Sequence, residues 1–238
     1  MLPEWQKGIV RRIESVNAAT RRYFIELPSV QRFDFKPGQF VTLDLPIHEV
    51  RNRRWRSYSI ASAPDGSNVI ELIIVLVEEG AGTPYLFNEI SEGSELTLRG
   101  PHGLFVLPEE LAEEMFLIST GTGIAPFRSM VKFLAANPRP HAPIHLIFGC
   151  RSQAEMLYRD ELEHLARTVP DLHYYPTLSR EAWEGRRGYV HAIYEELCKS
   201  RPPAQFMLCG WKAMIDEAKQ RILDMGYEKK RIHLELYG

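Results

Sequence analysis

The chain has 238 residues, of which 45% are hydrophobic and 25% charged, as expected for a soluble globular protein of one large or two compact domains. Its net charge of −2 excludes the strongly basic balance of a dedicated nucleic-acid-binding protein. Three cysteines without a Cys-x-x-Cys spacing support neither a disulfide framework nor a zinc or iron–sulfur site.

No targeting or membrane segment is expected. The first ten residues lack the apolar core of a signal peptide. The longest apolar stretch, Val69–Val77, contains Glu71 and is too short to span a bilayer. These features indicate a reduced, cytoplasmic protein, which we expect to be a monomer with no membrane or nucleic-acid partner and no metal site.

The first part of the chain shows short β-type runs separated by Pro and Gly turns. In one of them Val41, Leu43 and Leu45 alternate with polar residues, as in a half-buried strand. The expected strands are Gly8–Val16, Arg22–Leu27, Gln39–Leu45, Arg56–Ala61, Ile70–Glu78 and Glu95–Leu98. Together with a short helix around Pro84–Ile90, this pattern predicts an antiparallel barrel or sandwich.

Beyond Pro108 short apolar runs alternate with helical stretches. The expected strands are Met115–Ser119, Ile144–Phe148, Leu172–Pro176, Gln205–Cys209 and Arg231–Leu236, and the expected helices are Ile124–Ala136, Ser152–Thr168, Val190–Lys199 and Lys212–Met225. This order predicts an α/β, Rossmann-like domain with a five-stranded parallel sheet covered on both faces. A boundary near Leu107–Glu110 divides the chain into domains 1–108 and 109–238.

The segment Ser119–Pro126 follows an apolar strand and opens a helix. Glycines at this bend let backbone N–H groups approach a diphosphate, and the helix N-terminus favours negative charge. The pattern is G-x-G-x-x-P rather than the dinucleotide pattern G-x-G-x-x-G, so a tight turn capped by Thr remains an equal alternative.

Residues 1–60 hold nine Arg and two Lys against six acids, a net charge of +5, and four of these arginines fall within residues 51–56. On a strand, Arg56 and Tyr58 lie on one face, and Ser57 and Ser59 on the other. A guanidinium beside an aromatic ring suits a phosphate attached to a flat ring system. The alternative is a solvated basic strand edge.

These residues resemble the R-x-Y-S flavin motif of the ferredoxin–NADP reductase family, whose other landmarks follow in the same order. They are Gly80-Ala81-Gly82-Thr83 with Leu86, Gly93 with Gly100-Pro101-His102-Gly103, Gly121–Pro126, Leu208-Cys209-Gly210 and Glu235-Leu236-Tyr237. The resemblance covers nearly the whole chain and implies an FAD-binding barrel followed by an NAD(P)-binding domain. FMN is a less favoured alternative to FAD.

The resemblance also implies residue roles. Catalytic roles, as groups around the flavin and nicotinamide, are implied for Ser59, Cys209, Glu235 and Tyr237. Cofactor contacts are implied for Arg56, Ser57, Tyr58, Ser59, Ile60, Gly82, Thr83, Thr120, Gly121, Thr122, Gly123, Pro126, Arg151, Ser179, Arg180, Arg187, Cys209, Gly210 and Tyr237. Outside the resemblance, Cys209 is interpreted as a small buried residue, Glu235 and Tyr237 as a polar tail, His102 as a satisfied turn residue, and Trp211 as packing.

The choice between NADPH and NADH depends on the 2′-phosphate, a dianion that arginines bind in bidentate fashion. Arg151, Ser179, Arg180 and Arg187 match the positions that hold this phosphate in relatives that use NADP, so NADP is favoured and NAD remains possible.

The leading interpretation is an electron-transfer flavoenzyme that reduces ferredoxin, flavodoxin or an oxygenase component. Arg51, Arg53 and Arg54 would then offer a positive surface to an acidic carrier. A reductase of free flavin, ferric chelates or quinones is the first alternative. A non-catalytic flavin- or nucleotide-binding regulator is the second.

Overall fold

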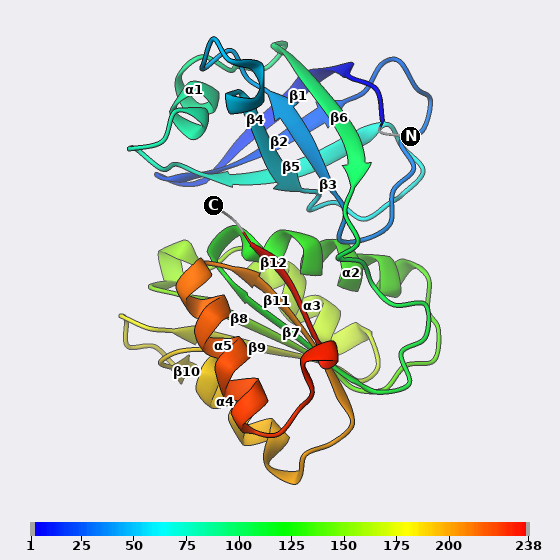
Figure 1. Cartoon of the computed structure of the whole chain (residues 1–238), viewed down its shortest axis with the longest axis vertical. Helices are drawn as coiled ribbons and strands as arrows, with labels where there is room; N and C mark the ends of the chain where they lie inside the picture. Colours follow the sequence, from blue (N-terminus) through cyan, green and yellow to red (C-terminus); the bar gives the residue numbers. More distant parts are fainter. Residues whose placement is uncertain (1–2, 237–238) are drawn as a thin grey trace. The chain divides into compact units, whose positions relative to one another are not determined.

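The computed structural model describes residues 3–236, which form two compact units (Figure 1). The first unit runs to Leu107 and also takes in Arg128–Met130, and the second comprises Pro108–Phe127 and the chain from Val131 onward. Throughout residues 3–236, every helix is too short or too polar to span a membrane.

The first unit is a closed antiparallel barrel, as predicted. Its strands are β1 (Gln6–Asn17), β2 (Thr20–Glu26), β3 (Phe40–Asp44), β4 (Trp55–Ser59), β5 (Val69–Val75) and β6 (Glu95–His102). They pair in the order β4-β3-β6-β1-β2-β5, and each neighbouring pair is antiparallel. The two outermost strands then meet, because Ile60 forms an antiparallel bridge with Leu72 and the Ala61 N–H donates to the Glu71 carbonyl (2.8 Å).

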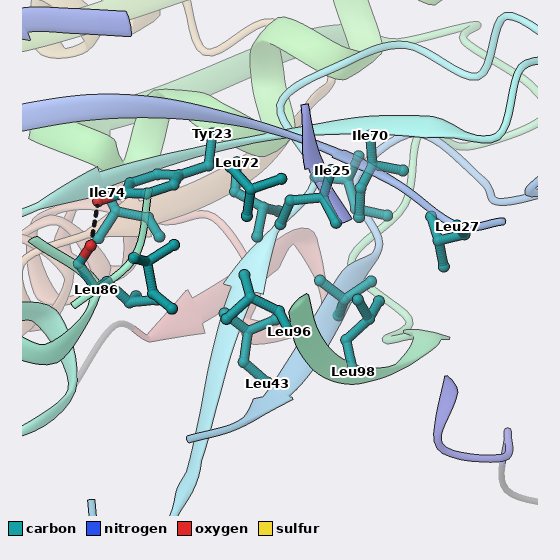
Figure 2. Close-up of a cluster of buried hydrophobic side chains, with 14 of the residues drawn as sticks. Tyr23, Ile25, Leu27, Leu43, Ile70, Leu72, Ile74, Leu86, Leu96 and Leu98 are labelled. Carbon is teal, nitrogen blue, oxygen red and sulfur yellow. Dashed lines mark hydrogen bonds between the residues drawn. The ribbon is translucent and has the colours of Figure 1, made fainter. Parts of the chain in front are cut away.

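The barrel core gathers branched aliphatic side chains from β1, β2, β3, β5 and β6 (Figure 2). Val41, Leu43 and Leu45 are fully buried, as the alternation predicted, but Thr42 between them is buried as well, so this part of β3 is covered on both faces. Tyr23 is also fully buried, and its hydroxyl donates to the Leu86 carbonyl of α1 (Gly82–Asn88) at 2.9 Å (Figure 2). This hydrogen bond fixes the short helix against the barrel.

The second unit contains a six-stranded parallel sheet in the order β10-β9-β8-β7-β11-β12. Its strands are β7 (Glu114–Thr120), β8 (Ile144–Cys150), β9 (Leu172–Leu178), β10 (Arg186–Arg187), β11 (Ala204–Gly210) and β12 (Ile232–Leu236). Five strands were expected. The additional β10 is two exposed arginines long, so no hydrophobic pattern marks it in the sequence.

Four α-helices cover this sheet: α2 (Ile124–Ala136), α3 (Arg159–Thr168), α4 (His191–Leu197) and α5 (Lys212–Asp224). Figure 1 shows α4 and α5 on one face and α2 and α3 on the other. The core under α4 and α5 includes Phe116 and Phe206, whose rings stack 5.0 Å apart.

The expected helix over Ser152–Thr168 is wrong in its first part. A 3-10 turn occupies Gln153–Glu155, and α3 begins only at Arg159. Tyr158 between them has a φ of 55°, a left-handed conformation that interrupts a right-handed helix. The hydrophobic spacing continues through this break, so the sequence pattern alone does not reveal it.

Candidate functional site

Arg56 lies on β4 with its charge uncommitted to any acid. Its Nη1 donates to the carbonyl oxygens of Trp55 (2.8 Å) and Arg53 (3.1 Å), which orients the guanidinium. No carboxylate of residues 3–236 forms an ion pair with it, whereas Arg54 is paired with Asp44 at 2.8 Å. The side chain rests against Gly82, where an added Cβ would lie 2.9 Å from Arg56 Cγ. Arg56 and Gly82 therefore form a cradle that fits a phosphate group.

The next residues of β4 follow the predicted alternation. Tyr58 is half-buried against the barrel core, and burial raises the pKa of its phenol far above the ordinary value. Ser59 is buried, whereas Ser57 is exposed and its hydroxyl lies 3.1 Å from that of Thr42. The aromatic ring and the guanidinium thus share one face, as a flat ring bearing phosphates requires.

Two residues predicted to contact the flavin also have structural roles. Ile60 is fully buried, its N–H donates to the Gln39 carbonyl (2.9 Å), and it closes the barrel. The Thr83 hydroxyl donates to the Val77 carbonyl (3.2 Å) and accepts from the Val77 N–H (2.8 Å). The single proton of that hydroxyl is therefore used within the loop that precedes α1.

In the second unit, β7 ends at Thr120 and leads through the 3-10 turn Gly121–Gly123 directly into α2. The first N–H groups of such a turn have no intrahelical acceptor and can bind an anion. Pro126 in the first helical turn removes no N–H that the helix needs. The chain turns sharply here because Gly121 has a φ of 55°, which glycine adopts without strain.

The end of β11 packs closely on this turn. A Cβ on Gly123 would lie 2.4 Å from the carbonyl oxygen of Cys209, and one on Gly210 would lie 2.5 Å from Thr120 Oγ1. Gly210 also has a φ of 137°, outside the usual range of other residues. Both glycines are therefore required by backbone geometry, which explains the spacing of the two motifs.

Cys209 and Glu235 are neighbours in the sheet. The register pairs Cys209 of β11 with Glu235 of β12 on one side and with Ser119 of β7 on the other. Cys209 is fully buried, and Glu235 is half-buried on β12. The interpretation of Glu235 as part of a polar tail is therefore wrong. Tyr237, the last predicted catalytic residue, lies outside the described residues.

Three predicted arginines gather where β8, β9 and β10 meet. The Ser179 N–H donates to the Cys150 carbonyl and the Arg180 N–H to the Arg151 carbonyl, both at 3.0 Å, which joins the loops after β8 and β9. Arg187 pairs with Leu178 at the end of β9. All three arginines are exposed, and the ion pairs of the described residues leave Arg180 and Arg187 without an acid, whereas Arg151 has Glu155 at 4.0 Å.

Two exposed aromatic residues at this end of the sheet were missed or misassigned. Tyr189, 73% exposed, follows Gly188 next to the arginines. Trp211 is 56% exposed, so its interpretation as packing is wrong. In the sequence, both could have been found as an aromatic residue that directly follows a glycine at the carboxyl end of a strand.

The interpretation of His102 as a satisfied turn residue is also wrong. It ends β6, its ring lies 5.6 Å from that of Phe40, and its Nε2 is buried without a hydrogen-bond partner in residues 3–236. Burial and the nearby Arg99 charge lower the pKa of His102.

Comparisons with known families agree with this geometry. Residues 7–107 match the oxidoreductase FAD-binding domain, and residues 117–220 match the oxidoreductase NAD-binding domain. The matched regions contain the Arg56–Gly82 cradle and the turn after β7, respectively. The molecule is therefore an oxidoreductase with FAD and a nicotinamide dinucleotide as cofactors.

The chain belongs to the ferredoxin–NADP reductase family. It is 37% identical over 238 residues to ferredoxin–NADP reductase B of Sorangium cellulosum, with 94% of each chain covered. It is 32% identical to the glycine betaine monooxygenase reductase subunit of Pseudomonas aeruginosa, but covers 57% of that protein. Seven relatives, this subunit among them, are longer than the chain, which spans 57–63% of their length.

The fold agrees with that of solved structures. The cytochrome P450 reductase of Amycolatopsis superimposes with a TM-score of 0.86 at 27% identity, covering 98% of this chain and 70% of that one. The ferredoxin–NADP⁺ reductase of Neisseria gonorrhoeae shares the fold, with a TM-score of 0.81 at 24% identity and 98% of each chain covered.

Proposed function

We propose that this protein transfers electrons from NADPH through FAD to a one-electron carrier protein, such as a ferredoxin, a flavodoxin or an oxygenase component. The observation that carries the proposal is the pair of phosphate-binding arrangements, one on each unit: Arg56 against Gly82, and the turn Gly121–Gly123 against Cys209. We assign residues 1–108 to the FAD domain and residues 109–238 to the nucleotide domain. We also propose a monomer, since each arrangement is complete within one chain.

In the flavin domain, Arg56 would bind the FAD diphosphate, because its charge has no acidic partner among residues 3–236 and its fork suits two phosphate oxygens. Tyr58 would pack against the isoalloxazine ring and stay protonated, since burial raises the pKa of its phenol. Ser59, buried beside it, would orient the ring through its hydroxyl. Bound FAD supplies the chemistry that accepts a hydride and releases electrons singly.

In the nucleotide domain, the N–H groups of the turn Gly121–Gly123 would bind the dinucleotide diphosphate. Cys209 would shape the nicotinamide pocket as a small buried residue, without acting as a nucleophile, because hydride transfer needs positioning rather than a thiolate. Glu235, held next to Cys209 by the register, would orient the nicotinamide or serve as a proton relay near the flavin. Tyr189 would stack on the adenine at the arginine cluster.

The preference for NADPH follows from Arg151, Arg180 and Arg187, which lie together at one edge of the sheet. Anaerobic rapid mixing should show flavin bleaching about tenfold faster with subsaturating NADPH than with NADH. The R180Q variant should lose about tenfold in affinity for NADPH and keep its affinity for NADH. R186Q is the matched control, because Arg186 is already paired with Glu196 at 2.8 Å. Faster bleaching with NADH would refute the preference, and bleaching with neither would refute the enzymatic function.

The carrier would dock on the basic segment that precedes β4. Arg51 and Arg53 are exposed there, although Arg51 lies 3.9 Å from Asp44. Arg54 pairs with the same carboxylate at 2.8 Å and contributes less than the sequence suggested. Reduction of an acidic carrier should slow about tenfold between about 0.05 and 0.5 M salt, as surface charges become screened. The rate at which a small dye is reduced should change little with salt. The R53E variant should slow only the reduction of the carrier. Equal salt sensitivity of both acceptors would favour a reductase of small molecules.

A further inference from the structure

Trp211 is tied to the dinucleotide turn by its backbone. It follows Gly210 at the end of β11 and precedes α5, and its N–H donates to Thr120 Oγ1 at 3.3 Å. Gly210 approaches the backbone of Thr120 so closely that a Cβ there would lie 2.8 Å from the Thr120 carbonyl oxygen. These contacts leave the Trp211 Cα little freedom relative to the turn.

The indole is directed toward the turn and not into the core. The side chain is 56% exposed, although tryptophan is usually largely buried. The atom nearest to a Cβ placed on Gly121 is Trp211 Nε1, at 3.6 Å. The ring nitrogen therefore lies close to Gly121, the first residue of the turn.

The Trp211 Nε1–H is an unused donor. Within residues 3–236 it donates to no acceptor, whereas the corresponding N–H of Trp183 donates to the Arg186 carbonyl. An indole nitrogen can only donate, so a group that completes this site must be a hydrogen-bond acceptor, such as a phosphate oxygen. The turn beside it favours negative charge.

We infer that the Nε1–H of Trp211 donates a hydrogen bond to the diphosphate of the bound pyridine dinucleotide, which makes Trp211 a positioning residue for NADP(H). The inference rests on the proposed function, because it assigns a further donor to the same nucleotide site. A side-chain donor added to the backbone N–H groups would fix the diphosphate, and through it the nicotinamide, relative to Cys209.

The test compares W211F with the wild type, using calorimetry on the oxidised, FAD-loaded protein. Phenylalanine keeps an aromatic ring and removes the N–H. The two probes are NADP⁺, which contains the bridging diphosphate, and adenosine 2′,5′-bisphosphate, which does not. We expect W211F to weaken NADP⁺ binding about tenfold and to leave the bisphosphate unchanged. W5F in the first unit is the matched control and should bind both probes like the wild type.

Each outcome separates the inference from the function on which it rests. Unchanged NADP⁺ binding by W211F would refute the hydrogen bond while leaving the proposed function intact. Equal loss of both probes would refute it as well, because a general distortion of the domain would then explain the effect. Failure of NADP⁺ to bind the wild type would refute the proposed use of NADPH, on which the inference rests.

Discussion

Replacing Arg56 with glutamine is expected to lower the affinity for FAD about 100-fold, because two charge-assisted hydrogen bonds to the diphosphate are lost. Among residues 3–236 no acid pairs with this guanidinium, so its removal leaves no buried charge behind. The barrel should remain folded, since the core beneath β4 is unaffected. The affinity is measured by titrating the apoprotein with FAD and following flavin fluorescence, and far-UV circular dichroism checks the fold.

Two further variants sharpen this experiment. R56K keeps the charge but loses the planar fork, so about a tenfold loss is expected. R53Q removes a nearby exposed arginine that does not rest against Gly82, and it should retain FAD. Equal loss of FAD in R53Q and R56Q would show that the positive field of the segment, and not the cradle, holds the cofactor.

Replacing Gly123 with alanine is expected to reduce NADP⁺ affinity at least about 100-fold, with FAD content unchanged. The new Cβ would lie 2.4 Å from the Cys209 carbonyl oxygen and 2.7 Å from the Gly210 Cα. Both are backbone atoms, so the turn or β11 must move, and tight packing makes such shifts costly. Calorimetry with NADP⁺ and the flavin absorbance of the purified variant measure the two quantities.

The matched comparison is G121A, two residues earlier in the same turn. A Cβ there meets no atom closer than 3.6 Å, and the cost is the left-handed φ of 55°, about 1–2 kcal/mol. G121A should therefore lose about tenfold in affinity. Equal NADP⁺ affinity of G123A and G121A would show that close packing of Gly123 on Cys209 does not determine the shape of the turn.

The sequence predicted the fold where hydrophobic patterns are regular. Period-two alternation in β3 and the apolar runs of the parallel strands were sufficient to locate these strands. Ten of the eleven expected strands begin and end within three residues of their expected bounds. Closure of the barrel is different, because the Ile60–Leu72 bridge joins residues whose pairing depends on the curvature of the whole sheet. The break at Tyr158 is likewise conformational and leaves no compositional trace.

For the candidate site, the sequence pointed to the positions where backbone geometry is restricted, and the ligand contacts of the site residues stay a prediction. Gly123 and Gly210 are constrained by backbone geometry, and they coincide with the motifs because an added Cβ would meet neighbouring atoms at 2.4 and 2.5 Å. Exposure and hydrogen bonding are tertiary properties, so the exposure of Trp211 and the hydrogen bonds between Thr83 and Val77 could not be predicted from their neighbours in the sequence. The same holds for Arg54, whose pairing with Asp44 spans two strands.

Closure of the barrel has a consequence for association between chains. Unpaired strand edges can serve as templates for intermolecular β-pairing, and a closed barrel presents none. In the described sheets, the remaining edges are β10, which consists of two arginines, and β12. Leu234 and Leu236 of β12 are 40% and 50% exposed, but they alternate with His233 and Glu235. Strand-mediated aggregation of this protein should thus begin at β12, with Glu235 as the charge that opposes it.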